Sequence, residues 1–418
     1  MRPPLYYGWV IVATLFVVNF ATHATGTLNL GLFVIPMGDA LGISRGLFGW
    51  LTTARYLAGG LSAIFLGRLL DRFGPRLLIP ASALVTGLCV IGFGMADNVV
   101  QLFLLFTVIG LAGLSTPGGG LLSSVPVAKW FVRRRGTAIA LASLGLGLGG
   151  ITLLPITQVL INVVEWRRAW LYLGITSMVL IIPPALIYLR RQPEDLGLRP
   201  DGDTGPSTGP DSTEEKEDEE AAWTLKEALH TRAFWLLTTA LVLGGFGMGA
   251  SIHRIPYWVE LGFDADLVSL SFSADAAGAT VMMLGAGFLL DRFPARFVAA
   301  GAYAGFAGAL VLMLTASSTF DLFASVVLWG LAIGINIVSQ TYLWADYFGR
   351  AFLGTIRGIT LPTIMLASAF GAPTVGYIFD FSGGYEPAWR ALIAVYLLAL
   401  VIMVTAKPPH RNPRRPAG

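Results

Sequence analysis

Long uninterrupted runs of apolar residues recur along the chain and dominate its pattern of hydrophobic and polar positions. Each run reaches the length of about 20 residues that a helix needs to cross the hydrocarbon core of a bilayer. No segment alternates apolar and polar residues for long enough to suggest a membrane barrel. The pattern therefore predicts an all-α membrane protein with twelve transmembrane helices, at roughly 7–36, 46–66, 77–96, 99–127, 136–162, 168–190, 233–259, 266–290, 296–316, 320–345, 352–379 and 386–406.

The composition agrees with lipid as the surrounding solvent. Hydrophobic residues make up 55% of the 418 positions and charged residues 13%, whereas soluble domains carry about 25% charged residues. The first apolar run is longer than the core of a signal peptide, so we expect it to be a retained span. The single cysteine, Cys89, excludes an internal disulfide and a metal cluster held by several thiolates.

Positive charge is concentrated in every second loop, and this predicts the orientation in the membrane. Lys and Arg favour the cytoplasmic side of a membrane protein. With the N-terminus placed inside, the outside loops hold few basic residues, and these are mixed with acidic ones. We therefore expect a multi-pass protein of the plasma membrane with both termini in the cytoplasm. The inside group includes Arg68, Arg72, Arg76, Lys129, Arg134, Arg292, Arg296, Arg357 and Lys407, and the outside group is Arg45, Arg167, Arg168 and Arg390.

One long polar segment separates six predicted helices from six. It is rich in Gly and Pro and contains the acidic run Glu214–Glu220, a composition that cannot bury a core. Such charge blocks are usually solvated spacers, although an acidic run can also bind a partner. We predict a six-helix bundle at 1–190, a mostly disordered cytoplasmic linker at 191–230, and a second six-helix bundle with a short basic tail at 231–418.

The two halves of the chain resemble each other at a fixed offset of 220 residues. The segment Gly67–Arg76 (GRLLDRFGPR) matches Gly287–Arg296 (GFLLDRFPAR), and Ile35-Pro36 matches Ile255-Pro256. Two bundles related by such a repeat enclose a binding site near the midplane, which rocking motions expose to each side in turn. We therefore expect two pseudo-symmetric six-helix bundles.

The two matching segments also predict a gating motif in the loop after the second helix of each half. The glycines allow close approach of helices, and the aspartates suit a helix N-terminus, where the macrodipole favours an anion. Such a latch would hold one conformational state more firmly than the other. The alternative is that its arginines only set topology. The motif residues are Gly67, Asp71, Arg72, Arg76, Gly287, Asp291, Arg292 and Arg296.

These features together resemble the major facilitator superfamily over nearly the whole chain. A narrower set of motifs, at Tyr6–Trp9, Trp130–Ala138 and Tyr347–Arg350, is similar to the branch of monocarboxylate porters and oxalate/formate antiporters. The resemblance implies the major facilitator fold and transport of a small organic anion, with a proton or by exchange. The arginine that monocarboxylate porters carry in the eighth helix has no counterpart within 269–290 of this sequence.

Polar side chains inside the predicted spans are candidates for a substrate site, because such residues are rare in membranes and usually functional. The first and tenth spans each carry a polar stripe at helical spacing, and in the superfamily these two helices line the cavity. The alternative is hydrogen bonding between helices, which uses the same residue types. A His-Arg pair in the outer third of the seventh span suits an outer gate or a funnel for anions. The candidates are Asn19, His23, Asn336, Gln340, His253 and Arg254.

Arg55 and Asp275 occupy the same place in the two repeats with opposite charges. Each lies twelve residues before the glycine of its gating motif, about 18 Å from that end of the helix and close to mid-membrane. We expect separate roles, in which Arg55 holds the substrate anion and desolvation prepares Asp275 to carry the coupled proton. A direct ion pair between them is the less favoured alternative, and separate structural partners are another.

The sequence thus favours a secondary transporter of a monocarboxylate-like anion that works by alternating access. An exporter of drug-like or amphipathic compounds and a membrane sensor without transport activity are the alternatives. The spacing of residues matches no metal site, phosphate loop or nucleophile elbow, so we expect no enzyme activity, no cofactor and no metal. The expected partners are a small carboxylate and the lipid bilayer, without nucleic acid, and the chain is expected to be a monomer.

Overall fold

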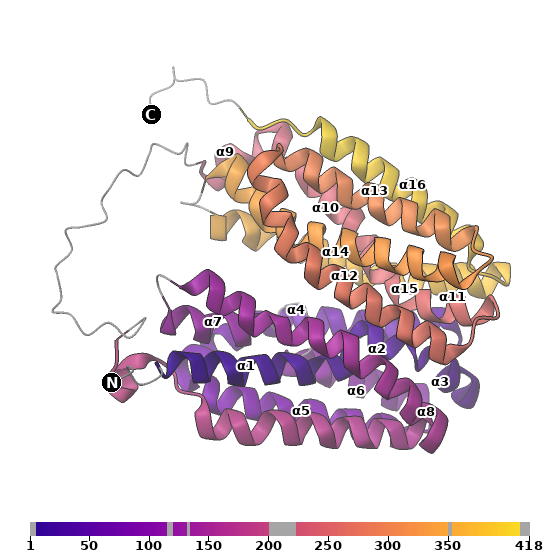
Figure 1. Ribbon diagram of the computed structural model, residues 1–418, viewed down its shortest axis with the longest axis horizontal. Coiled ribbons are helices and arrows are strands. Elements are labelled where there is room, and N and C mark those ends of the chain that lie inside the picture. The colour runs from indigo at the N-terminus through magenta and orange to yellow at the C-terminus, as the bar shows by residue number, and fades with distance from the viewer. Residues whose placement is uncertain (1–5, 115–119, 132–133, 200–222, 350–352, 410–418) are drawn as a thin grey trace. The chain divides into compact units, whose positions relative to one another are not determined.

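The computed structural model describes residues 6–114, 120–131, 134–199, 223–349 and 353–409, and these are helical almost throughout (Figure 1). The side chains of a few residues inside helices, among them Gly67 and Asp71, also lie outside the description. Within the described part of the chain, nine helices are long and apolar enough to cross a membrane. Together with the helices discussed below, they confirm the predicted fold of twelve transmembrane helices.

The twelve spans correspond to the following elements. The first half contains α1 (Gly8–Thr22), η1 (His23–Thr25), α2 (Thr27–Gly31) and α3 (Val34–Leu41) for span one, then α4 (Arg45–Phe73), α5 (Pro75–Met95), α6 (Val99–Ala112) with α7 (Gly120–Trp130), and α8 (Arg135–Tyr188). The second half contains α10 (Arg232–Ala250), η5 (Ser251–His253) and α11 (Arg254–Glu260) for span seven, then α12 (Ala265–Arg292), α13 (Ala295–Leu314), α14 (Thr319–Phe348), α15 (Leu353–Ser382) and α16 (Glu386–Thr405). Two short helices, η3 (Pro193–Leu196) and α9 (Leu225–Leu229), lie within the predicted linker 191–230, near its two ends.

Some of the twelve spans fall outside the simple pattern of one long apolar helix each. Helix α8 comprises spans five and six, which meet at Glu165, where φ is 66° and ψ is 160°. Helix α6 has 14 residues, about 21 Å, too short to cross a core of about 30 Å, and α7 lengthens it. Helix α4 has 29 residues and is long enough, but it contains Arg55 and the charged residues of its gating motif.

The first span of each half is broken, although both were predicted as continuous runs. Span one changes to a 3-10 turn at His23 and becomes extended at Gly26 (φ −69°, ψ 165°). Span seven changes to a 3-10 turn at Ser251 before α11 begins. In both cases the break precedes the repeated Ile-Pro, whose proline lacks the backbone N–H needed to continue an undisturbed helix. Hydropathy averaged over a whole span does not detect these breaks, because each span stays apolar overall although polar residues such as His23 and Ser251 stand at the break.

The helices form two compact units that do not follow the order of the sequence. Unit 1 contains Met1–Thr204 together with Gly249–Ala277 and Ala369–Tyr385, and unit 2 contains Gly205–Met248, Gly278–Ser368 and Glu386–Gly418. The end of span seven, the beginning of span eight and the end of span eleven therefore pack with the first half of the chain. The predicted boundaries at 1–190, 191–230 and 231–418 divide the chain along its sequence, whereas the two units group residues that pack together in space. The predicted boundaries stay a prediction.

In unit 1, glycines bring α8 into close contact with its neighbours. Helices α1, α5 and α8 run side by side (Figure 1). A Cβ atom at Gly145 would collide with the backbone oxygen of Phe16, and one at Gly149 would lie 2.7 Å from the backbone oxygen of Phe20. Only glycine allows α1 and α8 to approach to this distance, as small residues generally do between membrane helices.

Two of the three motifs that resemble the monocarboxylate branch, Tyr6–Trp9 and the start of Trp130–Ala138, come together at one end of unit 1. The Tyr6 hydroxyl donates to the backbone oxygen of Trp130 (2.9 Å), and the Tyr7 hydroxyl donates to that of Tyr188 (2.8 Å). The Trp9 and Phe131 rings lie 4.9 Å apart. These contacts tie the start of α1 to the ends of α7 and α8, which gives the two motifs a shared structural role.

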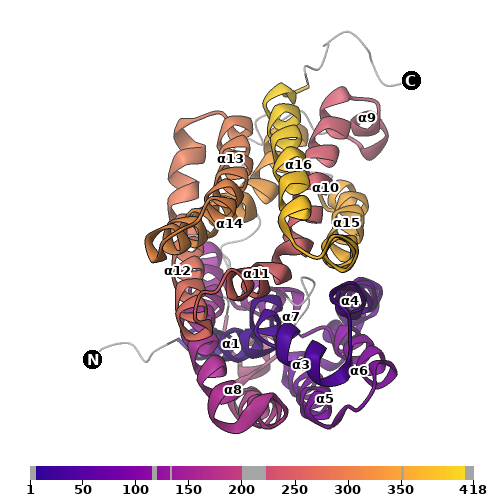
Figure 2. The same ribbon diagram turned by 90° about the vertical axis from the view of Figure 1, so that its right-hand side faces the viewer.

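Unit 2 is held together around α13, which packs between α14 and α16 (Figure 2). An aromatic cluster fills this contact, with Phe306 stacked 5.0 Å from Tyr396 and tilted 4.8 Å from Trp329. The Ser325 hydroxyl donates to the backbone oxygen of Ala309 (2.8 Å) and links α14 to α13.

Candidate functional site

A buried ion pair joins Arg254 to Asp275 inside unit 1. The guanidinium Nη1 donates to the carboxylate Oδ2 at 2.9 Å, and both side chains are only 1% exposed. The Arg254 guanidinium also lies over the ring of Phe272, at 4.7 Å from its centroid. Either charge alone would be strongly destabilised at this depth, so each depends on the other or on a substitute of the same charge.

Local breaks in the helices place this pair. Arg254 is the first residue of α11, directly after the 3-10 turn of η5, and Asp275 lies in the interior of α12. A 3-10 segment in the middle of a membrane helix often marks a functional hinge. Arg254 therefore stands at the point where span seven passes from a 3-10 turn back into an α-helix.

His23 borders the same region from the break in span one. A Cβ atom at Gly150 would lie 3.2 Å from Nε2 of His23 and 2.7 Å from Cβ of Ala276, the residue after Asp275. In the described part of the chain, His23 Nε2 and Asp275 Oδ1 are both buried and have no hydrogen-bond partner. Unsatisfied buried polar atoms are uncommon and require an explanation, and two of them beside an ion pair favour a ligand or a proton as the missing partner.

Arg55 is also buried in unit 1, at 6% exposure. It lies on α4 where that helix meets α6, because a Cβ atom at Gly110 would collide with the Arg55 backbone oxygen. The basic partner of Asp275 is instead Arg254, twenty-one residues earlier in the same repeat. The assignment of Arg55 to the substrate anion stays a prediction.

The remaining predicted site residues have structural contacts. Asn19 donates from Nδ2 to the backbone oxygen of Ala142 (2.9 Å), which links α1 to α8. Within α14 of unit 2, Gln340 Nε2 lies 3.5 Å from Asn336 Oδ1. Hydrogen bonding between or within helices accounts for these contacts, and a role in lining a cavity stays a prediction.

His253 uses both ring nitrogens in contacts with α15 and with Tyr385, three residues after the end of that helix. Nε2 lies 2.9 Å from the backbone oxygen of Ala372, and Nδ1 lies 3.2 Å from the hydroxyl of Tyr385. A carbonyl can only accept, so Nε2 carries the proton and Nδ1 accepts from Tyr385. His253 is fully buried, and this pattern suits a neutral imidazole that joins η5 to α15.

Sequence reasoning did not identify a second charged cluster, at the start of α4. Asp380 near the end of α15 accepts hydrogen bonds from the backbone N–H groups of Arg45 (3.1 Å) and Gly46 (2.9 Å). The Arg45 side chain donates to the backbone oxygen of Val34 (2.8 Å) and pairs with Glu260 at 3.5 Å. We call these contacts the α4 cap. The carboxylate at a helix N-terminus is stabilised by the unpaired N–H groups and by the macrodipole.

A corresponding contact lies at the start of α12. Asn162 of α8 donates to the carboxylate of Asp266 at 2.6 Å. In each case the end of the fifth helix of one repeat contacts the start of the second helix of the other repeat. The 220-residue offset could have drawn attention to these two helix starts, since Gly46 of α4 and Asp266 of α12 occupy equivalent positions.

The described residues of the gating motif lie at the opposite ends of α4 and α12 and at the starts of the helices that follow, α5 and α13. Arg76 donates from Nε to the backbone oxygen of Leu186 (2.9 Å), and Arg72 lies over the ring of Phe73. Arg292 lies 3.8 Å from the centroid of Phe288, and Arg296 lies 4.8 Å from that of Phe297. Gly67 and Asp71 fall outside the described side chains, and the state-dependent latch formed by the two motifs stays a prediction.

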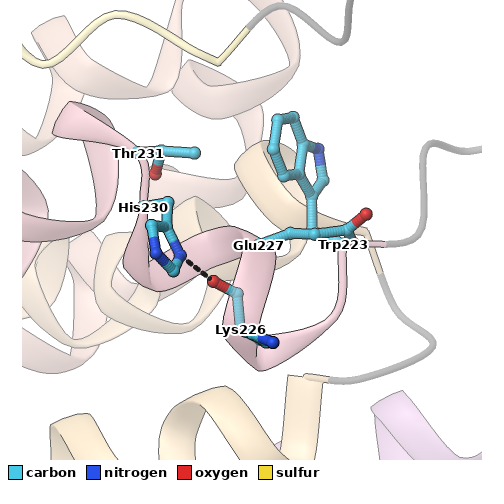
Figure 3. A pocket seen from close by; sticks show the side chains of 5 residues that line it. All are labelled: Trp223, Lys226, Glu227, His230 and Thr231. Atoms are coloured by element: carbon cyan, nitrogen blue, oxygen red, sulfur yellow. Dashed lines mark hydrogen bonds between the residues drawn. The ribbon is translucent and has the colours of Figure 1, made fainter. Parts of the chain in front are cut away.

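A shallow pocket of about 380 Å³ at helix α9 contains none of the predicted site residues (Figure 3). It is lined by Trp223, Lys226, Glu227, His230 and Thr231. Its histidine is held by the backbone, with Nδ1 at 2.6 Å from the oxygen of Lys226. These residues precede α10 and lie outside the membrane helices, so the pocket does not contribute to the candidate site.

Comparisons with known proteins agree with this architecture. A sequence profile of the Major Facilitator Superfamily matches residues 15–359 and 254–418. Monocarboxylate transporter 13 of Bos taurus is 23% identical over 97% of this chain and 90% of its own length. The oxalate:formate antiporter of Oxalobacter formigenes is 27% identical over 58% of this chain and 54% of its own length.

Among solved structures, the crystal structure of the nucleoside transporter NupG has a similar fold. It matches with a TM-score of 0.72 over 97% of this chain and 99% of its own, at 13% identity. The two relatives described above confirm the resemblance to the monocarboxylate-like branch, and the NupG structure confirms the fold.

The α4 cap leads to a prediction about stability. Replacing Asp380 with alanine removes the acceptor of two backbone hydrogen bonds, and the loss of a helix cap typically costs about 0.5–2 kcal/mol. We expect Asp380→Ala to lower the melting temperature of the purified protein, measured by a thermal shift in detergent. Asp97→Ala is the matched control, because Asp97 belongs to an exposed ion pair with Arg167, and such pairs contribute little. Equal melting temperatures of the two variants would contradict the assigned cap.

Proposed function

Because the chain belongs to the Major Facilitator Superfamily, we propose that it is a secondary active transporter of a small organic anion that resembles a monocarboxylate. The buried ion pair between Arg254 and Asp275 is the observation that carries this proposal. A cation in the protein interior that is held by one titratable carboxylate can exchange that carboxylate for the carboxylate of a substrate. Relatives named for monocarboxylate transport and for oxalate:formate exchange support the same class of substrate.

The electrostatics of the pair suggest how proton and anion are coupled. A buried Arg without a counter-ion is costly, so Arg254 keeps Asp275 ionised while no substrate is bound. When a proton neutralises Asp275, Arg254 requires another anion, and the substrate carboxylate supplies it. One proton and one monocarboxylate then cross together without net charge. Exchange of one bound anion for another needs no change at Asp275, so both modes use the same pair.

Neighbouring residues support the two steps. His23 borders Ala276 and has a buried Nε2 without a hydrogen-bond partner in the described residues. It is therefore a candidate to hydrogen-bond a substrate oxygen or to pass a proton to Asp275. Arg55 adds positive charge to the interior of unit 1 and attracts an anion from the aqueous side. This arrangement favours a charged substrate over the large apolar compounds that an exporter of drug-like molecules would carry.

We propose further that both termini are cytoplasmic and that the protein lies in the plasma membrane. Three of the four arginines assigned to the outside loops have an acidic partner, and Arg168 is the fourth. The pairs are Arg45 with Glu260, Arg167 with Asp97 and Arg390 with Glu386. Exposed arginines at the opposite helix ends, such as Arg72 and Arg191, have no such ion pair among the described residues. This difference is the expected pattern when unneutralised positive charge remains inside.

The orientation can be measured with single cysteines. In a Cys89→Ser background, we expect Asp97→Cys to react with an impermeant thiol reagent in intact cells and Glu194→Cys to react only after permeabilisation. Both positions are exposed, so reactivity reports on the side of the membrane. The reverse pattern of labelling would invert the topology.

Asp275→Asn tests the proton step. The amide cannot ionise, so we expect uptake into proteoliposomes to lose its dependence on an inward proton gradient while exchange of internal for external substrate continues. A panel of radiolabelled carboxylates, measured with and without the gradient, checks this. Gradient-driven uptake that matches the native protein would exclude Asp275 as the proton carrier.

Arg254→Gln tests the anion step. Loss of one member of a buried charged pair costs about 2–5 kcal/mol, so we expect substrate affinity to fall at least about 30-fold. Because Arg254→Gln alone leaves Asp275 uncompensated, the double variant Arg254→Gln/Asp275→Asn serves as a folded control, which we also expect to bind no anion.

Arg55→Gln, measured in parallel, distinguishes the two arginines. If Arg254 holds the carboxylate and Arg55 only attracts it, the Arg55 variant should retain saturable uptake at reduced affinity. Native affinity in the double variant, with loss of affinity in Arg55→Gln alone, would transfer the anion site to Arg55.

A further inference from the structure

Unit 1 contains a second basic site, far from the ion pair in the sequence, at the junction of α4, α5 and the end of α8. It is a pocket of about 580 Å³ with three arginines and one aspartate in its lining, a net charge of +2. Its lining residues are Phe73, Gly74, Arg76, Leu77, Leu186, Arg190, Arg191, Asp195 and Leu196. We propose that this pocket binds the phosphate-bearing headgroup of an anionic phospholipid.

The arginines leave donors available to a ligand. Arg76 uses Nε for the backbone oxygen of Leu186, and Arg190 uses Nη1 for the backbone oxygens of Ile187 and Leu189. These bonds fix the two side chains and leave other guanidinium N–H groups available. Arg191 has no ion pair or side-chain hydrogen bond among the described residues. Planar guanidinium groups suit phosphate oxygens because they can donate two parallel hydrogen bonds.

The backbone adds to the positive field of the pocket. Helix α5 begins at Pro75 after Gly74, and no side chain caps its N-terminus. Gly74 has φ 73°, and a Cβ atom there would lie 3.5 Å from Cβ of Arg191. A helix of 21 residues directs unpaired N–H groups and a partial positive charge at this end. The aspartate is already engaged, since Asp195 accepts from the backbone N–H of Gln192 at 3.3 Å.

The position of the pocket favours a lipid over a soluble anion. Arg76 lies in the first turn of one membrane span, and Arg190 and Arg191 follow the end of another. Apolar side chains continue from the pocket along the membrane helices and are exposed, with Phe73 at 52%, Leu77 at 57% and Leu186 at 38%. Acyl chains can cover this surface while the headgroup occupies the basic pocket. Basic pockets at the ends of membrane helices bind anionic headgroups in this way.

The proposal is tested by lipid binding to the purified full chain in detergent, without any transport assay. Titration with phosphatidylglycerol should leave bound lipid in native mass spectra and raise the melting temperature, whereas phosphatidylcholine should do neither. Each surface arginine contributes about 1 kcal/mol to attraction of anionic lipid, so we expect Arg191→Gln to weaken phosphatidylglycerol binding about fivefold. Arg168→Gln is the matched control, because Arg168 is an exposed arginine of α8 outside the pocket.

Several outcomes would overturn the proposal. An equal loss of binding in Arg191→Gln and Arg168→Gln would reduce the effect to general surface charge. Inorganic phosphate that stabilises the protein as well as the lipid does, at the same concentration, would indicate a site for a soluble anion. Lipid binding that arises only after deletion of residues 202–220 would indicate that the acidic run of the chain itself is the occupant. The melting temperatures of both variants without lipid confirm that they are folded.

Discussion

The interior of this protein must keep Arg254 neutralised, and much of its architecture serves that requirement. The guanidinium lies 2.9 Å from Asp275, and both side chains are only 1% exposed. Moving an isolated ion into such a buried position is expensive by several kcal/mol even after relaxation. The protein can therefore exchange the partner of Arg254 but cannot leave the position without an anion. That constraint converts a static ion pair into a device that links protonation to anion binding.

The broken helices and the glycines make the constraint compatible with a packed membrane bundle. The 3-10 turn of η5 places Arg254 at the start of a new helix, where its side chain reaches α12. Gly149 and Gly150 of α8 leave room for His23 and Ala276 beside the pair. Larger residues at these glycines would separate the three helices and remove the contacts that fix the site. Local irregularity and close packing thus contribute to the same arrangement.

The fold could be predicted from the sequence to a large extent, because apolar run length and the 220-residue repeat each report directly on transmembrane helices and their pairing. For the site, the sequence identified the candidate residues but not which of them are in contact. Arg254 and Asp275 were identified as candidates, but the offset compares equivalent positions, and it therefore directed attention to Arg55 as the residue related to Asp275. Equivalence by repeat does not imply contact. The breaks at His23 and Ser251 lie inside spans that are apolar overall, so run length does not report them. The role of Asp380 as a helix cap depends on which helix start it meets in space.

The two repeats share a backbone plan, but the residues at equivalent positions differ, and the ion pair depends on these differences. Val34 of the first half corresponds to Arg254 of the second, and Arg55 corresponds to Asp275, so the functional pair lies within one half although the backbone plan is shared.

The same asymmetry holds for the contacts at the helix starts. The α4 cap uses a carboxylate on two backbone N–H groups with an ion pair beside it, whereas the corresponding contact at α12 is a single amide-to-carboxylate hydrogen bond. Charge-assisted bonds are roughly twice as strong as neutral ones, and the cap has more of them. If alternating access separates both contacts, most of the free energy of opening this end of unit 1 is therefore needed at the α4 cap, and the two pseudo-symmetric contacts are unequal in mechanism.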